Sequence, residues 1–239
     1  MATNYALTND AQSVVSGLLP DIRFNDRIAI FGQTGTGKTI LAHYIFRTVK
    51  VRLPSDKRPE GQWRLCIDVT DSIFDDALAF YDPLNIPWDL SPSLRYVPNM
   101  SSTESEQDFN DLYLGIMAHG DVWVWLDEAN EVSSAHKTIP GLRQVLLQGR
   151  KFQIGHCAVT PRPVDISRSI FTQSQHLFIF PLTDNDDRTR VAKNIGLEPD
   201  ELEEVMATMP DFGFLWYDVR SRTLLELPPI PFEVVEELE

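Results

Sequence analysis

The most informative segment of the chain is Gly32-Gln33-Thr34-Gly35-Thr36-Gly37-Lys38-Thr39. It fits the phosphate-binding pattern G-x-x-x-x-G-K-S/T, and it lies between an apolar run at Arg27 to Phe31 and a helix-like stretch, as that pattern requires. Its glycines allow successive amide groups to face phosphate oxygens, and the following helix adds a positive N-terminal end. We therefore predict that all eight residues contact ATP, with Lys38 on the β- and γ-phosphates and the Thr39 hydroxyl on Mg²⁺.

Two acidic residues follow the most apolar run of the chain, Val122 to Leu126. An all-apolar run is typical of a central strand buried on both faces of a sheet, and ligands bind beyond the carboxyl ends of such strands. We predict that Asp127 binds Mg²⁺ through its water shell, while Glu128 orients and deprotonates the water that attacks the γ-phosphate. The pair favours hydrolysis over a small-molecule kinase reaction. A kinesin-type motor is excluded, because its head is considerably longer and its switch motifs are missing here.

The chain alternates short apolar runs, rich in β-branched or aromatic residues, with longer helix-like stretches. This alternation predicts an α/β fold with helices flanking a mostly parallel sheet, in an order that suits a RecA-like P-loop core. Residues 1–26 are predicted to be an N-terminal extension and residues 27–239 the P-loop ATPase domain. The predicted strands are Arg27 to Phe31, Arg64 to Val69, Leu94 to Val97, Val122 to Leu126, His156 to Thr160 and His176 to Phe180. The predicted late elements are helices at Asp184 to Asn194 and Glu198 to Met209, then a hairpin of Phe214 to Tyr217 and Leu224 to Leu227.

The charge of the chain limits its contacts with nucleic acid. Its 239 residues carry 21 basic and 35 acidic side chains, a net charge of −14, so any nucleic-acid contact must be local. No apolar run approaches the roughly 20 residues of a membrane-spanning helix, and the first residues lack the pattern of a secretory signal, so we expect a cytoplasmic protein. Cys66 and Cys157 lie in strand-like runs and are interpreted as small buried side chains without chemistry.

Two segments beyond the acidic pair carry a family resemblance. They are Gly149-Arg150-Lys151-Phe152-Gln153-Ile154-Gly155 and Val159-Thr160-Pro161-Arg162-Pro163-Val164-Asp165-Ile166. Together with the closing hairpin they resemble the FtsK/HerA family of DNA-translocating ATPases, whose members typically read G-R-K-F-G-I/L and A-T-Q-R-P-x-D-I/V. The resemblance covers residues from about 27 to 231 and implies a homo-oligomeric ring that moves double-stranded DNA with ATP.

The resemblance also implies roles for individual residues. Arg150 matches the arginine that completes the neighbouring protomer's site, and we take it as the candidate trans arginine finger, with Arg143 in reserve. An exposed arginine at the end of a helix, stabilised by the helix dipole, is the alternative interpretation. The chain departs from the family at Pro161, where a polar sensor, usually glutamine, is expected. Proline cannot sense phosphate, so that role falls to Thr160 or is missing.

The small size of the chain favours the single-domain members that package genomes in viruses with an internal membrane, as a ring at a capsid vertex. This predicts a capsid-vertex or membrane-associated viral partner, and a place in the host cytoplasm or the virion. Lys57 and Arg58, with Arg162 behind them, are the candidate pore residues that contact DNA, and ordinary solvated charges are the alternative. Two other functions stay open: a HerA-like motor in repair or conjugation, and a nucleotide-driven assembly ATPase that does not bind DNA.

Overall fold

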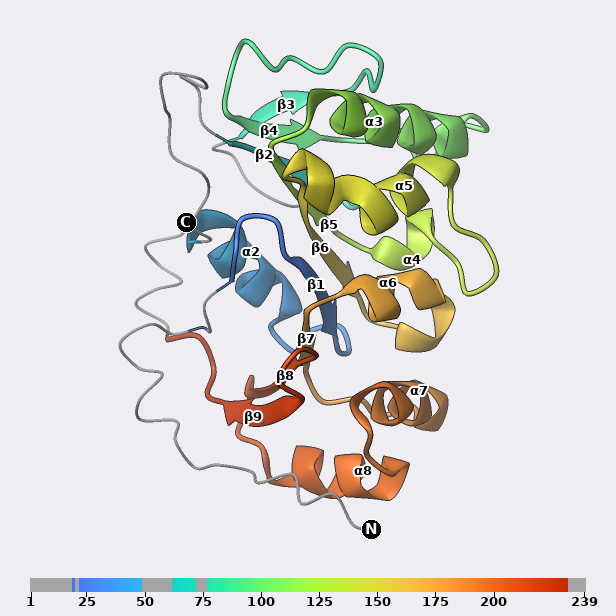
Figure 1. The fold of residues 1–239 in the computed structure, drawn as a ribbon. Coiled ribbons are helices and arrows are strands. Elements are labelled where there is room, and N and C mark those ends of the chain that lie inside the picture. Colours follow the sequence, from blue (N-terminus) through green and yellow to red (C-terminus); the bar gives the residue numbers. More distant parts are fainter. Residues whose placement is uncertain (1–18, 20–21, 49–61, 72–76, 232–239) are drawn as a thin grey trace.

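The computed structural model of the protein describes residues 19, 22–48, 62–71 and 77–231. Within these residues, nine strands form a sheet in the order β3-β4-β2-β5-β6-β1-β7-β8-β9 (Figure 1). Strands β1 to β7 pair in parallel, and β8 and β9 form an antiparallel hairpin that continues the sheet beyond β7. The predicted α/β fold with a mostly parallel sheet and a C-terminal hairpin is confirmed.

The strands have the following bounds: β1 (Arg27–Phe31), β2 (Trp63–Ile67), β3 (Leu78–Phe80), β4 (Ser93–Tyr96), β5 (Val122–Leu126), β6 (Gly155–Thr160), β7 (His176–Ile179), β8 (Phe214–Asp218) and β9 (Thr223–Leu227). All six predicted parallel strands are present: β1 and β5 have the predicted bounds, and the ends of the other four differ by at most two residues. The prediction missed β3, because three residues at the edge of a sheet are too few to show the period of a strand.

The helical segments have the following bounds: α2 (Lys38–Thr48), α3 (Ser105–His119), α4 (Ala129–Val132), α5 (Pro140–Gln148), η1 (Gly149–Phe152), η2 (Pro163–Asp165), α6 (Arg168–Gln173), α7 (Asn185–Ile195) and α8 (Pro199–Thr208). The two predicted late helices are confirmed. Their first predicted residues, Asp184 and Glu198, are the caps that precede each helix. Both carboxylates accept hydrogen bonds from backbone N–H groups of the first turn, which the helix itself leaves without partners.

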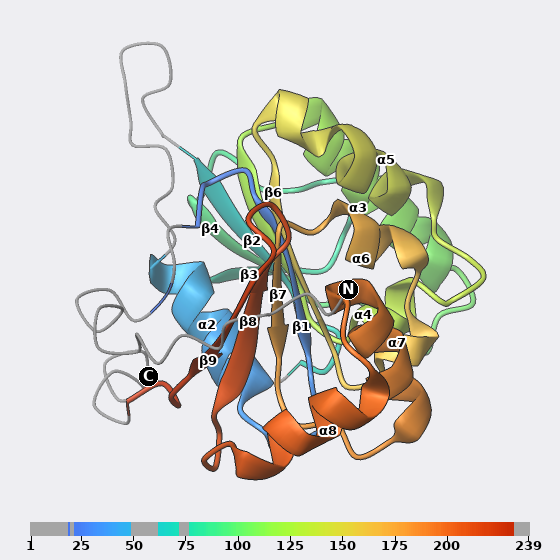
Figure 2. The same cartoon turned by 60° about the horizontal axis from the view of Figure 1, so that its bottom comes forward.

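Helices cover both faces of the sheet, which explains why the central strands are apolar throughout. On one face α2 packs against alternate residues of the strands, among them Trp123 and Trp125 of β5. On the other face α3, α5, α6 and α7 pack against the intervening residues, among them Val124 and Leu126 (Figures 1 and 2). Cys66 and Cys157 are buried in the α2 layer, where burial raises the pKa of each thiol, and they form no disulfide.

Two central strands, β5 and β6, approach each other closely where Trp123 pairs with Gly155. A Cβ atom added at Gly155, the first residue of β6, would lie 2.0 Å from Cε3 of Trp123 on β5. Glycine is therefore required there, because only a residue without a side chain leaves room for the indole ring. Strand β6 pairs with β5 on one side and with β1 on the other, so it separates the strand before the phosphate-binding loop from the strand before the acidic pair.

Several predictions concern residues outside the described part of the chain. The candidate pore residues Lys57 and Arg58 lie there, as do nearly all of residues 1–21. Ile22 packs in the α2 layer and Asp26 is buried, while the division at residue 27 stays a prediction. Among the residues that the structure describes, no helix is both long enough and apolar enough to cross a membrane.

Candidate nucleotide-binding site

The predicted phosphate-binding loop connects β1 to α2 at the carboxyl edge of the sheet. Gly32 has φ of +153°, and a Cβ atom there would lie 2.4 Å from Cβ of Phe180, so a side chain at this position would clash with the strand-end of β7. Gly37 has φ of +100°, which favours glycine. Backbone geometry therefore explains the glycines at positions 32 and 37, and α2 begins at Lys38, near the end of the motif, as predicted.

Lys38 lies folded back over this loop. Its side chain is only 6% exposed, and Nζ donates a hydrogen bond to the carbonyl oxygen of Gln33 at 2.6 Å. The Thr36 hydroxyl donates to the same oxygen at 2.7 Å. Burial lowers the pKa of Lys38, while the charges of Glu128 and Asp127 raise it. A buried ammonium group held by a single loop carbonyl is well placed to transfer its hydrogen bonds to phosphate oxygens.

The acidic pair lies across β6 from the loop, at the end of β5. Asp127 is 5% exposed, and its backbone N–H donates to the Ile67 carbonyl at 3.1 Å. Burial, together with the negative charges of Glu128 and Asp68, raises the pKa of Asp127 to about 7. Burial likewise raises the pKa of Glu128, which the charge of Lys38 lowers. The site thus holds more carboxylates than neighbouring cations.

Glu128 adopts a strained backbone conformation. Its φ and ψ are 48° and 57°, in the left-handed region that a glutamate rarely occupies, and α4 begins at the next residue. Strain of this kind is often retained where a side chain must point in a required direction. The turn places Glu128 between the end of β5 and the start of α4.

The composition of the site fits Mg²⁺ held jointly by protein and nucleotide. The available donors are the Thr39 hydroxyl and the Asp127 carboxylate, both hard oxygen ligands. In the described residues no group of three or more His, Cys, Asp or Glu side chains forms a metal cage.

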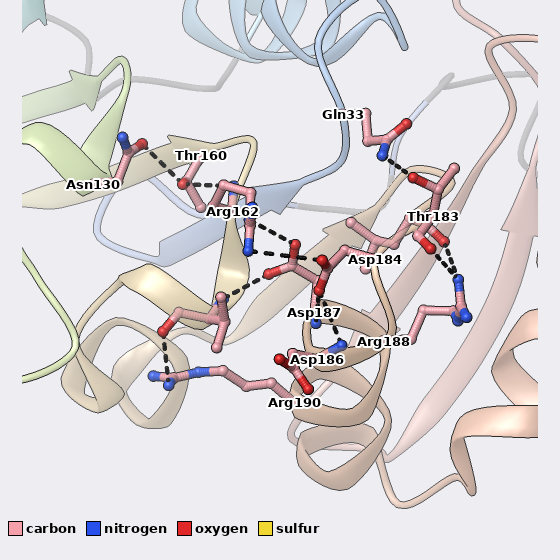
Figure 3. A network of polar contacts seen from close by, with 12 residues as sticks. Gln33, Asn130, Thr160, Arg162, Thr183, Asp184, Asp186, Asp187, Arg188 and Arg190 are labelled. Atoms are coloured by element: carbon pink, nitrogen blue, oxygen red, sulfur yellow. Dashed lines mark hydrogen bonds and ion pairs between the residues drawn. The ribbon is translucent and has the colours of Figure 1, made fainter.

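Thr160 ends β6 and lies opposite Phe31 in the sheet, directly beside the start of the loop. Its buried hydroxyl donates to Oδ1 of Asn130 at 3.0 Å and accepts a hydrogen bond from the backbone N–H of Arg162 at 3.2 Å (Figure 3). Asn130 lies two residues after Glu128, in α4. The predicted sensor is therefore connected to the acidic segment, and a role on phosphate stays a prediction.

Arg162 lies at the carboxyl edge with its guanidinium group bound to α7. Its Nε atom is 3.0 Å from Oδ2 of Asp187, and Nη2 is 3.9 Å from Oδ2 of Asp184 (Figure 3). These ion pairs direct the side chain toward the helix rather than into a free DNA-binding loop. In the same picture Gln33 donates a hydrogen bond to Thr183, one residue before Asp184, which connects the phosphate-binding loop to this cluster.

Arg150 lies at the opposite edge of the sheet from the loop. It belongs to η1, which precedes the amino end of β6, and its positive charge contributes, after burial, to lowering the pKa of Arg27 at the start of β1. A five-residue strand spans roughly 15 Å, so Arg150 cannot reach the loop of its own chain. Its side chain is exposed and has no hydrogen bond or ion pair to the described residues. Arg143, the reserve candidate, is exposed on α5.

Sequence reasoning missed four polar residues of the site: Asp68, Asn130, Thr183 and Asp187. Asp68 is fully buried at the end of β2, next to β5, and the prediction had placed it inside a strand. A carboxylate at the end of an apolar strand was the available signal. The other three interact with partners far along the chain, so no local pattern marks them.

The comparisons with known proteins agree with this geometry. The chain is 28% identical over 212 residues to the DNA packaging ATPase P9 of Enterobacteria phage PRD1, covering 86% of this chain and 87% of P9. The chain is a homologue of viral DNA-packaging ATPases. No protein-family model matches it.

Solved structures show that the packaging ATPases and this chain share a fold. The genome packaging NTPase B204 of Sulfolobus turreted icosahedral virus 2, in complex with AMPPCP, matches with a TM-score of 0.68 at 19% identity, covering 87% of this chain and 100% of B204. The N-terminal domain of zonular occludens toxin from Neisseria meningitidis matches with a TM-score of 0.53 at 14% identity, covering 89% and 97%. The predicted resemblance to FtsK/HerA-type P-loop ATPases, and among them to single-domain packaging ATPases, is confirmed.

Proposed function

We propose that this chain is an ATPase that drives double-stranded DNA into a viral capsid. The observation that supports hydrolysis is the meeting of Lys38 and the phosphate-binding loop with Asp127 and Glu128 at one edge of the sheet, two strands apart. The observation that supports packaging is the homology to P9, a DNA packaging ATPase, along most of both chains.

The residues of the chain divide the work of hydrolysis. The loop amides and Lys38 bind the phosphates, and the ammonium group exchanges the Gln33 carbonyl for phosphate oxygens. Thr39 and Asp127 would hold Mg²⁺, which when bound offsets the negative charge of the β- and γ-phosphates. Glu128 orients a water molecule in line with the γ-phosphate and accepts its proton. Its raised pKa moves it toward the pH at which proton acceptance is efficient.

Arg150 is proposed to act on the site of a neighbouring subunit. It is exposed at the edge of the sheet opposite its own loop, so only a head-to-tail arrangement can bring it to a nucleotide. Repeating such a contact with rotational closure generates a ring. In that ring the guanidinium group would stabilise charge on the γ-phosphoryl oxygens during hydrolysis.

DNA contact is proposed to be local, since the net charge of −14 opposes general binding to phosphate. Lys57 and Arg58 remain the candidates, and they lie outside the described residues. A few cations per subunit around a pore would suffice for weak, repeated contacts while the outer surface stays acidic. A capsid-vertex or membrane-associated viral protein is the proposed docking partner, and the host cytoplasm or the virion the proposed location.

The experiment that tests this function is steady-state Mg-ATP hydrolysis with and without linear double-stranded DNA. We expect DNA to accelerate turnover, and the acceleration to fall with salt as expected for phosphate contacts. Lys57→Ala combined with Arg58→Ala should reduce the stimulation and leave the rate without DNA unchanged. Turnover that ignores DNA would contradict the motor and favour the assembly ATPase.

A further inference from the structure

An exposed aromatic side chain lies against the phosphate-binding loop and has no part in the chemistry described above. Phe212 belongs to the turn between α8 and β8, which passes beside the start of α2 (Figure 2). A Cβ atom added at Gly37 would lie 3.5 Å from Cδ1 of Phe212 and 3.9 Å from its Cβ. The ring is 56% exposed. A residue 175 positions along the chain from Gly37 thus borders the predicted nucleotide site.

The ring is not needed to fill the core. Phe180 and Phe214, its neighbours behind the loop, are each 1% exposed and pack on one another with ring centroids 5.1 Å apart. These two rings already close the apolar layer beneath the loop. Phe212 lies beyond them with more than half of its surface in contact with solvent, where a free aromatic ring stabilises the fold little.

The backbone of Phe212 is also strained. Its φ is +61°, and the N–H of Gly213 bonds to the carbonyl of Pro210 at 2.9 Å, so Phe212 is the third residue of a tight turn. Positive φ at this position of a turn strongly favours glycine, and a bulky residue there is an outlier. The sequence thus holds an exposed phenyl ring beside the loop in a conformation that costs stability, which is expected where the ring has a ligand.

The order of groups along the loop predicts which part of a nucleotide meets this ring. Lys38 bonds to Gln33, so the terminal phosphates belong at the Gln33 end of the loop, near the acidic pair. The α-phosphate then lies at the Gly37 end, by the first turn of α2, and the sugar and base leave from there. Thr39 and Ile40 in that turn are exposed, which leaves this side open.

We propose that Phe212 is the stacking platform for the purine base of the bound nucleotide. The proposal rests on the nucleotide site proposed above and adds the group that recognises the base. A phenyl face accepts the π-face of a base without reading its hydrogen-bonding edges, and a purine offers the larger face. The platform therefore favours purine over pyrimidine nucleoside triphosphates and discriminates weakly between ATP and GTP.

The test compares a ligand that carries the adenine nucleoside with one that consists of the phosphate chain alone. Dissociation constants are measured by calorimetry with Mg²⁺ for AMPPCP and for inorganic triphosphate, in the wild-type chain and in four variants. Phe212→Ala and Phe212→Gly should weaken AMPPCP binding about 5- to 100-fold and leave triphosphate binding unchanged within about twofold. Phe212→Tyr should keep the wild-type affinity. Phe152→Ala, the matched control, removes a ring that is 45% exposed at the amino edge, and should change neither affinity.

The melting temperature of the nucleotide-free protein separates base stacking from a structural role. Because glycine adopts positive φ without strain, Phe212→Gly should melt at the same temperature as the wild type or higher, although it binds AMPPCP less tightly. A lower melting temperature for this variant, equal loss of both ligands, or unchanged AMPPCP affinity would overturn the proposal. A wild-type chain that binds neither ligand would instead contradict the nucleotide site itself.

Discussion

The acidic residues of the site repel one another and thereby destabilise the folded protein. Asp127 has two negative neighbours, Asp68 and Glu128, and burial removes the solvent that would screen them, so its pKa rises to about 7. Lys38 lowers this pKa but does not cancel the effect. Such an excess of negative charge is relieved when a divalent cation binds. The proposed metal-binding role of Asp127 would therefore oppose the stability of the nucleotide-free protein.

Replacing Asp127 by asparagine should stabilise the nucleotide-free protein. A carboxyl group whose pKa is raised in the folded state destabilises that state as pH rises from its unfolded value near 4 through about 7. At pH 8 the whole penalty is present, so Asp127→Asn should gain roughly 1 to 3 kcal/mol in free energy of unfolding, measured by urea denaturation. The gain should shrink as pH falls to 5. The exposed Asp89→Asn is the control, and an Asp127→Asn protein less stable than the wild type at pH 8 would contradict the interpretation.

The same group predicts the pH dependence of Mg²⁺ binding. A protonated carboxyl group does not bind Mg²⁺, so protons compete with the metal below about pH 7. The Mg²⁺ concentration that gives half-maximal ATP hydrolysis should rise as pH falls from 8 to 6, by up to about tenfold per pH unit below the pKa. A half-maximal concentration independent of pH across this range would exclude Asp127 from the metal site.

The sequence predicted those site residues that are recognised from their immediate neighbours in the chain. The phosphate-binding loop, Lys38 and the acidic pair are each readable from a few consecutive positions and one flanking strand. Asn130 and Phe212 were not readable, because their importance arises from contacts with Thr160 and Gly37, many positions away along the chain. Such contacts exist only once the sheet has brought the strands' ends together.

The strands and helices were predicted well where one periodicity dominates. Val122 to Leu126 is apolar throughout because α2 covers one face of the sheet and α3 and α5 the other. The sequence analysis did not predict the edge strand β3 (Leu78–Phe80). Of its three residues, Leu78 is 38% exposed and only Phe80 is buried. Edge strands bury one side at most, so their sequence carries little signal.

The contact between β5 and β6 predicts a cost for one small substitution. Gly155→Ala would place a Cβ atom 2.0 Å from the ring of Trp123, which is itself fully buried and cannot move freely. Overpacking of this kind should lower the free energy of unfolding by about 1 to 3 kcal/mol or more, measured by urea denaturation.

Gly115→Ala is the matched control for this substitution. The Cβ atom added in α3 would approach Cδ1 of Ile86 at 2.9 Å, the flexible end of a half-buried side chain, and alanine favours a helix. It should be nearly neutral or stabilising. Equal losses at both positions would show that the indole ring of Trp123 can move aside, and that Gly155 is not required by packing.

The whole molecule presents different chemistry at its two edges. The loop and the acidic pair lie at the carboxyl ends of the strands, while Arg150 is exposed near their amino ends. If catalysis needs an arginine, the edge with the loop lacks Arg150, and the edge with Arg150 lacks a nucleotide site. The polarity of the parallel sheet therefore favours a heterologous, head-to-tail assembly over a symmetric dimer.

Mixing two inactive variants tests this arrangement. Glu128→Gln lacks the base, and Arg150→Ala lacks the proposed finger, so each protein alone should hydrolyse Mg-ATP slowly in the presence of linear DNA. Mixed equally, about one quarter of the contacts in a ring would join an intact Glu128 to an intact Arg150, and activity should recover toward that fraction. Glu128→Gln mixed with Lys38→Ala should not recover, because each site needs its base and its lysine in one chain and no chain in this mixture has both.

That second mixture is the control, since no chain in it has both Lys38 and Glu128. A site in one chain cannot borrow either residue from its neighbour, because both lie at the carboxyl edge with the loop. Any recovery in this mixture would therefore show that chains exchange parts of the site. The expected outcome is correspondingly recovery for the Arg150 mixture alone, and equal behaviour of the two mixtures would contradict a trans arginine.

The assignment of Glu128 as the base for ATP hydrolysis is tested most directly by the Glu128→Gln variant. Its rate of Mg-ATP hydrolysis is measured together with its affinity for AMPPCP. Glutamine should preserve the shape of the site, so AMPPCP should bind as in the wild type, while turnover should fall at least about 100-fold because no base accepts the proton of the water. Wild-type turnover in the glutamine variant would contradict the assignment of Glu128, and with it the proposal that this edge of the sheet hydrolyses ATP.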